Sequence, residues 1–283
     1  MPTKVKEKDY RAIAKKRIQR PSEMKRPPRF LVYSRNKKGK TTFGNSAGVQ
    51  HTLTIDPEGG TSQMTSKNPH VWHVDRWEDI DDVTQFLRHI NMCENCPTPH
   101  PFRWVCLDGL TKLSNMSLKY VMKLQEERSL DRIPGMVQQR DYGKSGELMK
   151  DLLGQYHNMP LGVVFTAQER QMEGYDADED EDVEGTPSAY VPDLPKGVRG
   201  TANSIVDVIG RLYVVRIETP NGIRAERRLW IGESVQYDTG YRSDFVLPDY
   251  VRQPTIPKMV SLMRTGKVPA KKTAAKKVAA TKS

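Results

Sequence analysis

Short apolar runs alternate with longer helical patterns along most of this 283-residue chain. A short apolar run is typical of a strand that is covered on both faces of a sheet. The predicted strands cover residues 30–34, 51–56, 103–108, 161–167, 206–218 and 225–232. The predicted helices cover residues 74–92, 109–128 and 143–159. Because strands joined through helices pair in parallel by right-handed crossovers, this order predicts an α/β fold with a mostly parallel sheet flanked by helices.

Two later segments modify this pattern. The sequence Pro-Asn-Gly at 220–222 lies between two strand-like runs, so it predicts a hairpin and antiparallel strands at one edge of the sheet. Residues 171–203 contain the acidic block DADEDEDVE and then a stretch rich in proline and glycine. Loops of this length are usually functional or disordered, so we expect a flexible loop here.

The net charge of +10 lies at the two ends of the chain. Residues 1–29 carry +8 and residues 264–283 carry +7, which leaves −5 for the residues between them. The C-terminal tail has lysine pairs among Ala, Thr and Val and lacks aromatic residues, so it cannot bury enough apolar surface to become ordered. One interpretation is salt-sensitive binding to a nucleic-acid backbone, and the other is a solubilising tail.

The composition excludes two classes of protein. No apolar run approaches the length of a membrane span, and the basic N-terminus has no apolar segment behind it that would make a secretory signal. Three cysteines do not make a disulfide framework. We therefore expect a protein without membrane contact in a reducing, cytoplasmic setting.

The stretch FLVYSRNKKGKTTFG at 30–44 runs from a predicted strand into a basic loop. A phosphate-binding P-loop has the form G-x-x-x-x-G-K-[ST] after a strand, and its N–H groups, lysine and hydroxyl hold phosphates and Mg²⁺. Here Ser34 replaces the first glycine, so its backbone must stay in ordinary φ/ψ space. The alternative is a lysine-rich turn. The predicted nucleotide-binding residues are Ser34, Arg35, Asn36, Lys37, Lys38, Gly39, Lys40, Thr41 and Thr42.

Three further polar residues follow predicted strands. Asp108 ends one strand, Glu58 follows another and Gln168 ends a third. An ATPase needs an acid near Mg²⁺, a group that positions water and a group that senses the γ-phosphate. Because the carboxyl ends of parallel strands meet at one edge of the sheet, we expect these side chains to gather beside Lys40. The predicted Mg²⁺ ligands are Thr41 and Asp108, and ATP is the predicted nucleotide.

Taken together, these motifs resemble the RecA-type ATPases, and more closely the shortened RecA-like proteins of phages that are grouped with single-strand annealing proteins (the Sak family). The resemblance covers about residues 29–217 and departs from the family at Ser34 and at the acidic insertion. The segments that carry it are SRNKKGKTT, TIDPEGG, WVCLDGLTKL, QQRDYG, VVFTAQER and SIVDVIGRLYVV. It implies a RecA-like ATPase domain, which we expect over 30–250. The charge distribution adds a basic extension over 1–29 and a linker with a disordered basic tail over 251–283.

The resemblance also implies residue roles and partners. Glu58 would activate the attacking water, and Gln168 would couple the nucleotide state to a DNA-binding loop. Single-stranded DNA would be held by basic residues near 127–142 and 169–203, because the acidic block itself repels phosphate. These basic residues are Arg132, Arg140, Lys144, Lys196 and Arg199. A homo-oligomeric ring or filament and a single-strand-binding protein are further expected partners, in the cytoplasm of an infected bacterial host.

A second motif, HINMCENCPTPH, places His89, Cys93, Cys96 and His100 within twelve residues. The spacing is similar to that of a small zinc knuckle, in which thiolates and imidazoles surround the metal. However, His89 lies on the predicted helix 74–92, so both histidines would have to reach across a short segment. The alternative is a pair of free cysteines in a loop.

The sequence leaves three functions open. The first is an ATP-hydrolysing protein that binds single strands in phage DNA recombination or strand annealing. The second is a nucleotide-binding annealing scaffold without significant hydrolysis. The third is a P-loop ATPase in phage replication or packaging, such as a helicase loader or a terminase-like motor.

Overall fold

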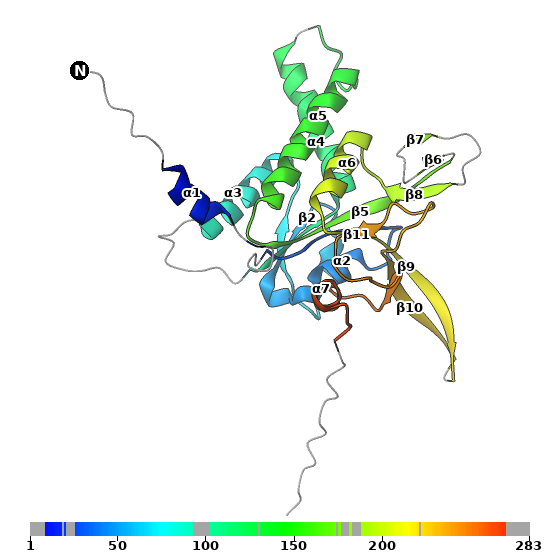
Figure 1. Ribbon diagram of the computed structural model, residues 1–283. Coiled ribbons are helices and arrows are strands. Elements are labelled where there is room, and N and C mark those ends of the chain that lie inside the picture. The colour runs from blue at the N-terminus through cyan, green and yellow to red at the C-terminus, as the bar shows by residue number, and fades with distance from the viewer. Residues whose placement is uncertain are drawn as a thin grey trace, which may run out of the picture.

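The computed structural model (Figure 1) describes residues 9–18, 20, 26–92, 102–129, 131–173, 175–176, 181–182, 188–220 and 222–269. Near the N-terminus, α1 (Tyr10–Arg17) begins after Asp9, whose side chain accepts hydrogen bonds from two backbone N–H groups of the first turn. Among the described residues, no helix combines the length and the apolar character needed to cross a bilayer.

The centre of the protein is one mixed sheet. Its strands lie in the order β12, β10, β9, β1, β5, β4, β2, β3. The six strands from β9 to β3 are parallel, and β10 and β12 are antiparallel at one edge. Their bounds are β12 (Tyr250–Arg252), β10 (Gly222–Trp230), β9 (Val208–Thr219), β1 (Arg29–Ser34), β5 (Gly162–Met172), β4 (Trp104–Asp108), β2 (Thr52–Asp56) and β3 (His70–His73). This confirms the predicted α/β fold with a mostly parallel sheet and an antiparallel edge.

Helices cover both faces of the sheet, and the alternation along β1 explains the two cores. Leu31 and Tyr33 pack against one set of helices, and Phe30 and Val32 pack against the other, because successive strand residues point to opposite faces. The first face carries α3 (Glu78–Met92), α4 (Leu110–Arg128), α5 (Gln139–His157) and α6 (Lys196–Ile205). The second carries α2 (Lys40–Gly44) and α7 (Ile256–Thr265), as Figure 1 shows.

The C-terminal segment differs from the predicted linker that begins at residue 251. β12 pairs with β10, and α7 buries Ile256, Met259 and Leu262 in the second core. The reason lies in α2, which has only five residues and continues as a short 3-10 helix over Asn45–Ala47. The short α2 leaves apolar sheet surface uncovered, and α7 supplies the missing layer. Residues beyond 269 lie outside the described part of the chain.

The segment 171–203 also differs from the predicted flexible loop. β5 continues to Met172, well beyond the predicted end, and pairs in antiparallel fashion with β8 (Ala189–Pro192). The apolar residues of β8 and α6 lie in cores, which explains why this part is regular. Within the acidic block, β6 (Tyr175–Asp176) pairs with β7 (Glu181–Asp182). The remaining residues of that block lie outside the described residues.

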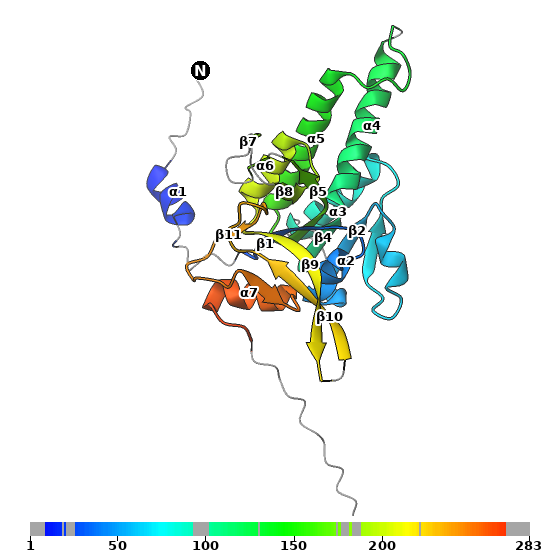
Figure 2. The same cartoon turned by 90° about the vertical axis from the view of Figure 1, so that its right-hand side faces the viewer.

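Two projections extend from this core. The predicted turn at 220–222 joins β9 and β10 into a long hairpin, in which Gly222 with φ 105° pairs with Thr219. Strand β11 (Gly240–Tyr241) pairs with the base of β9. On the opposite side of the sheet, the outer turns of α4 and α5 extend away from the body of the protein as an arm (Figures 1 and 2).

Candidate functional site

A cavity of about 540 Å³ lies at the carboxyl ends of β1, β2, β4 and β5, and we call it the sheet-edge cavity. It brings together Lys40, Thr41, Glu58, Asp108 and Gln168, which come from four separate parts of the sequence. The complete lining is Asn36, Lys37, Gly39, Lys40, Thr41, Thr42, Glu58, Gly60, Met64, Asp108, Gln168 and Arg227. The adjacent pairing of β1 with β5, and of β5 with β4, places these residues at one edge.

The loop between β1 and α2 contains two residues with positive φ. Lys37 has φ 61° and Gly39 has φ 105°, so both lie in the left-handed region. Ser34 is the last residue of β1, does not have positive φ and is fully buried. Its hydroxyl donates to the carbonyl of Arg35 at 2.9 Å. The Cβ of Ser34 is therefore compatible with this loop, because the strained conformations fall on other residues.

Lys40 is buried and its ammonium is held by oxygen atoms. Nζ donates to the carbonyl of Ser34 at 3.1 Å and to Oε1 of Gln168 at 3.2 Å. Burial lowers the pKa of Lys40, and the carboxylates of Glu58 and Asp108 partly oppose that shift. The ammonium is therefore held by internal oxygen atoms in a place that solvates it poorly.

Asp108 ends β4 and links two threonines. Thr41 Oγ1 donates to Oδ2 at 2.5 Å, and Thr166 Oγ1 donates to Oδ1 at 2.7 Å. Burial raises the pKa of Asp108, while the two hydroxyl donors act in the opposite direction. A carboxylate and a hydroxyl at this separation are hard oxygen groups that could hold a divalent cation, directly or through water.

Glu58 is placed by a turn that Asp56 organises. The Asp56 carboxylate accepts from the backbone N–H groups of Glu58, Gly60 and Thr61 at 3.1, 3.2 and 2.8 Å. The Glu58 side chain then lies over Gly109, where a Cβ would approach Oε1 to 3.0 Å. Gly109 also has φ 131°, so a side chain is disfavoured there on two grounds. Glu58 is exposed toward the cavity.

Gln168 connects these groups. Its Oε1 accepts from Lys40, and its Nε2 lies 3.4 and 3.5 Å from the two carboxylate oxygens of Glu58. Its backbone N–H donates to the Thr111 hydroxyl at 3.0 Å, and its carbonyl accepts from Asp193 just after β8. One side chain thus touches both the lysine and the acid, while its backbone is tied to the segment that follows.

Sequence reasoning missed three residues of the site. Asp56 directly precedes the PEGG turn, where a carboxylate able to accept several N–H groups is a recognisable signal. Thr166 is a hydroxyl in an apolar strand, which signals that a buried partner is needed. Arg227 lines the cavity from β10, and no local pattern in the sequence identifies it.

Two of the predicted DNA-binding residues are buried. Arg132 forms an ion pair with Asp141, and its side chain is only 1% exposed. Arg199 is 4% exposed and its guanidinium donates to the sulfur of Met172 at 3.6 Å. Neither arginine is therefore available as a surface contact, which corrects both predictions, because each side chain is buried against internal acceptors.

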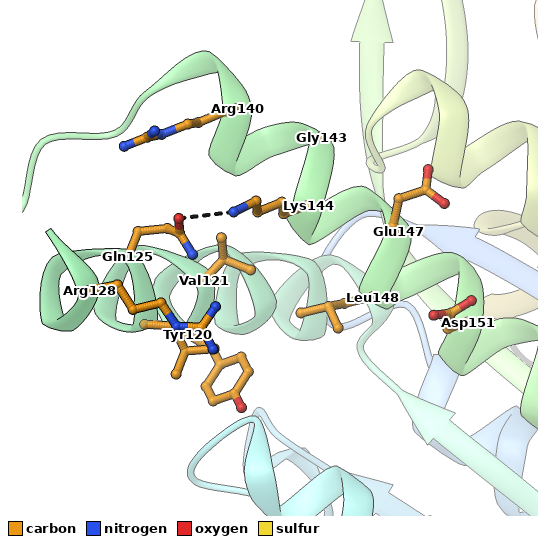
Figure 3. A pocket seen from close by; sticks show the side chains of 11 residues that line it. Tyr120, Val121, Gln125, Arg128, Arg140, Gly143, Lys144, Glu147, Leu148 and Asp151 are labelled. Carbon is orange, nitrogen blue, oxygen red and sulfur yellow. Dashed lines mark hydrogen bonds between the residues drawn. The ribbon is translucent and has the colours of Figure 1, made fainter.

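The other three basic residues are exposed. Lys196 begins α6, and Arg140 and Lys144 lie on α5. Arg140 and Lys144 border a groove of about 670 Å³ between α4 and α5, which we call the arm groove (Figure 3). Lys144 Nζ donates to Gln125 Oε1 across it at 2.9 Å. The groove is lined by Tyr120, Val121, Leu124, Gln125, Arg128, Arg140, Gly143, Lys144, Glu147, Leu148 and Asp151.

The predicted zinc ligands are not placed by the structure. Cys93, Cys96 and His100 lie outside the described residues. The backbone of His89 belongs to α3, but its side chain lies outside the described part as well. The choice between a zinc site and free cysteines stays open.

Two comparisons, with curated proteins and with solved structures, give the following results. No curated protein matches the chain. A KaiC-like protein from Pyrococcus horikoshii OT3 matches with 11% identity and a TM-score of 0.36, over 76% of this chain and 82% of its own. The flagellar accessory protein FlaH from Methanocaldococcus jannaschii matches with 10% identity and a TM-score of 0.36, over 81% and 87%.

The family comparison covers most of the chain. The model of the AAA domain matches residues 26–243, from just before β1 to just after β11. That span includes every residue that lines the sheet-edge cavity. The chain therefore belongs to the AAA domain family.

Proposed function

We propose that this protein binds ATP with Mg²⁺ in the sheet-edge cavity and hydrolyses it, and that it acts on single-stranded DNA in phage recombination or strand annealing. The observation that carries the first part is the joint position of Lys40, Thr41 and Asp108. An ammonium, a hydroxyl and a carboxylate converge at the end of a loop with two left-handed residues. This donor set suits a triphosphate with its cation.

Different residues would bind the phosphates and the cation. The N–H groups of the loop and the ammonium of Lys40 would hold phosphate oxygens. Lys40 would then donate to a phosphate oxygen in place of Oε1 of Gln168. Thr41 and Asp108 would hold Mg²⁺, with Thr166 fixing the carboxylate as it does here. Mg²⁺, when bound, neutralises negative charge on the phosphate oxygens.

Glu58 is the group best placed to orient a water molecule. It lines the cavity together with Asp108, is exposed, and its backbone is held by the Asp56 turn. The amide of Gln168 contacts both Lys40 and Glu58, so one side chain links the ammonium to the carboxylate. This arrangement supports general-base assistance by Glu58 and a sensing role for Gln168.

The proposed contact with single strands rests on charge and position. Arg140, Lys144 and Lys196 are exposed, and the basic ends of the chain add sequence-independent attraction for phosphate. The tie between the Gln168 carbonyl and Asp193 offers a route from the nucleotide to the segment that carries Lys196. A homo-oligomer and a single-strand-binding protein remain part of the proposal as partners.

ATP turnover with and without single-stranded DNA tests this function on the wild type and on Glu58→Gln. We expect turnover that DNA stimulates, and a loss of roughly 10²- to 10⁴-fold in Glu58→Gln with ATP binding retained. ATP binding without turnover in the wild type would support an annealing scaffold instead. Stimulation by duplex DNA with translocation would support a motor. Absence of ATP binding would overturn the proposal.

A further inference from the structure

The β9–β10 hairpin forms a wall beside the loop between β1 and α2. β9 pairs with β1 as far as Tyr33 and Arg211, and then continues beyond the end of β1 to Thr219. β10 returns along this extension, so Arg227 lies opposite Val214, three residues beyond the last pair with β1. The hairpin thus brings a residue from far along the sequence to the level of the sheet-edge cavity.

The side chain of Arg227 lies directly against Gly39. A Cβ built on Gly39 would come within 2.7 Å of Nε of Arg227 and within 3.3 Å of its Cζ. Gly39 has φ 105°, so the loop needs glycine there for its backbone as well as for this contact. This contact places the guanidinium beside the loop and in the lining of the cavity.

The surroundings of Arg227 leave its charge available. Among the described residues, its side chain has neither a hydrogen-bond acceptor nor an ion-pair partner. The next residue, Arg228, does have an acidic partner, since it donates to Glu226 at 2.9 Å. Arg252 donates to the same carboxylate at 3.0 Å. A guanidinium offers several donors in a fixed plane, which suits phosphate oxygens. The backbone is fixed, since the Arg227 carbonyl accepts from Gln253 at 2.8 Å.

We propose that Arg227 is a phosphate-binding residue of the sheet-edge cavity and contacts the polyphosphate of a bound nucleoside di- or triphosphate from within the same chain. This inference rests on the proposed nucleotide function and adds a ligand that the loop motif does not contain. A charge that completes such a site is commonly supplied by a neighbouring subunit. Here the hairpin supplies one in cis, so nucleotide binding does not have to await assembly.

The test measures the affinities of the full chain for ATP, ADP and AMP by isothermal titration calorimetry. The variants are Arg227→Ala, Arg227→Lys and, as a matched control, Arg224→Ala. Arg224 is exposed on the same strand and does not line the cavity, so it controls for the loss of one positive charge from the hairpin. Thermal unfolding of each variant shows whether the fold is intact.

We expect Arg227→Ala to weaken ATP and ADP binding by roughly 10- to 100-fold, with a much smaller effect on AMP. Arg227→Lys should recover part of the loss, because it keeps the charge and loses the planar set of donors. Arg224→Ala should bind as the wild type does. Equal losses for AMP, or equal affinities of Arg227→Ala and Arg224→Ala, would overturn the inference. A wild type that binds no nucleotide would instead refute the proposed function.

Discussion

The sheet-edge cavity and the arm groove have similar volumes, about 540 and 670 Å³, but they are built in different ways. The cavity gathers side chains from four strand ends and from a distant hairpin. The groove is formed by two consecutive helices, and its lining includes Val121, Leu124 and Leu148 together with several charged residues. Val121 and Leu148 lie between the two helices in Figure 3. The smaller space holds the groups with altered pKa values, Lys40 and Asp108.

This difference indicates which features mark a reactive site. Size does not separate the two spaces, since the groove is the larger one. Convergence of an ammonium, a hydroxyl and two carboxylates does separate them, because gathering such groups in a poorly solvated place costs free energy that simple packing would avoid. Burial lowers the pKa of Lys40 and raises the pKa of Asp108, because removal from water disfavours the charged form of each group.

The largest expected difference between the two spaces is in ATP affinity, when one lysine is removed from each. Lys40→Ala should weaken ATP binding by about 100-fold, because it removes a charged donor from a poorly solvated cavity. Lys144→Ala makes the same change in the arm groove and should leave ATP affinity unchanged. Calorimetric titration with ATP measures both. Similar affinities for the two variants would abolish the distinction between the spaces.

An intermediate effect is expected for Asp108→Asn. It should reduce the dependence of turnover on Mg²⁺ and lower turnover by roughly 10- to 100-fold, because the carboxylate fixes the cation. Since burial raises the pKa of Asp108, its charged form is disfavoured in the folded state. The stability that the proton provides is present at acidic pH and is lost as pH rises through the raised pKa.

Asp108→Asn should therefore have a higher Tm than the wild type at neutral pH without metal. Each kcal/mol gained in the free energy of unfolding corresponds to roughly 2–4 °C in Tm. This gain should vanish at a pH below the ordinary carboxyl range, where Asp108 of the wild type is also uncharged. Thermal unfolding as a function of pH measures it. A lower Tm at neutral pH would show that the bonds from Thr41 and Thr166 outweigh burial.

The smallest effect should come from the rim of the arm groove. Arg140→Ala and Lys144→Ala should each weaken single-strand binding at low salt and reduce the slope of log K against log salt by ~0.7. ATP affinity should not change. Lys123→Ala, an exposed lysine on α4 outside the groove, provides a control with the same loss of charge. Equal slopes in all three variants would mean that contact is diffuse and does not involve the groove.

Local sequence patterns predicted most of the fold. The apolar runs of β1, β2 and β4 matched the structure closely, and that of β5 matched its start, because a strand buried on both faces leaves a strong signal. The glycine turn of the β9–β10 hairpin was equally clear. Weaker signals were missed, such as β3, whose residues are half-buried or exposed, and α7, whose short amphipathic pattern follows a proline-rich stretch.

The candidate site divides along the same line. Lys40 and Thr41 follow β1, Glu58 follows β2 and Asp108 ends β4, and parallel strands bring such ends together, so these residues are visible in the sequence. Gln168 is visible as the end of an apolar run, although β5 itself continues to Met172. Burial of Arg132 and Arg199 could not be read there, since it depends on which acceptor tertiary packing delivers. The position of Arg227 beside Gly39 could not be read either. It depends on how far the β9–β10 hairpin extends beyond the end of β1, and only the pairing of strands in the complete sheet determines that distance.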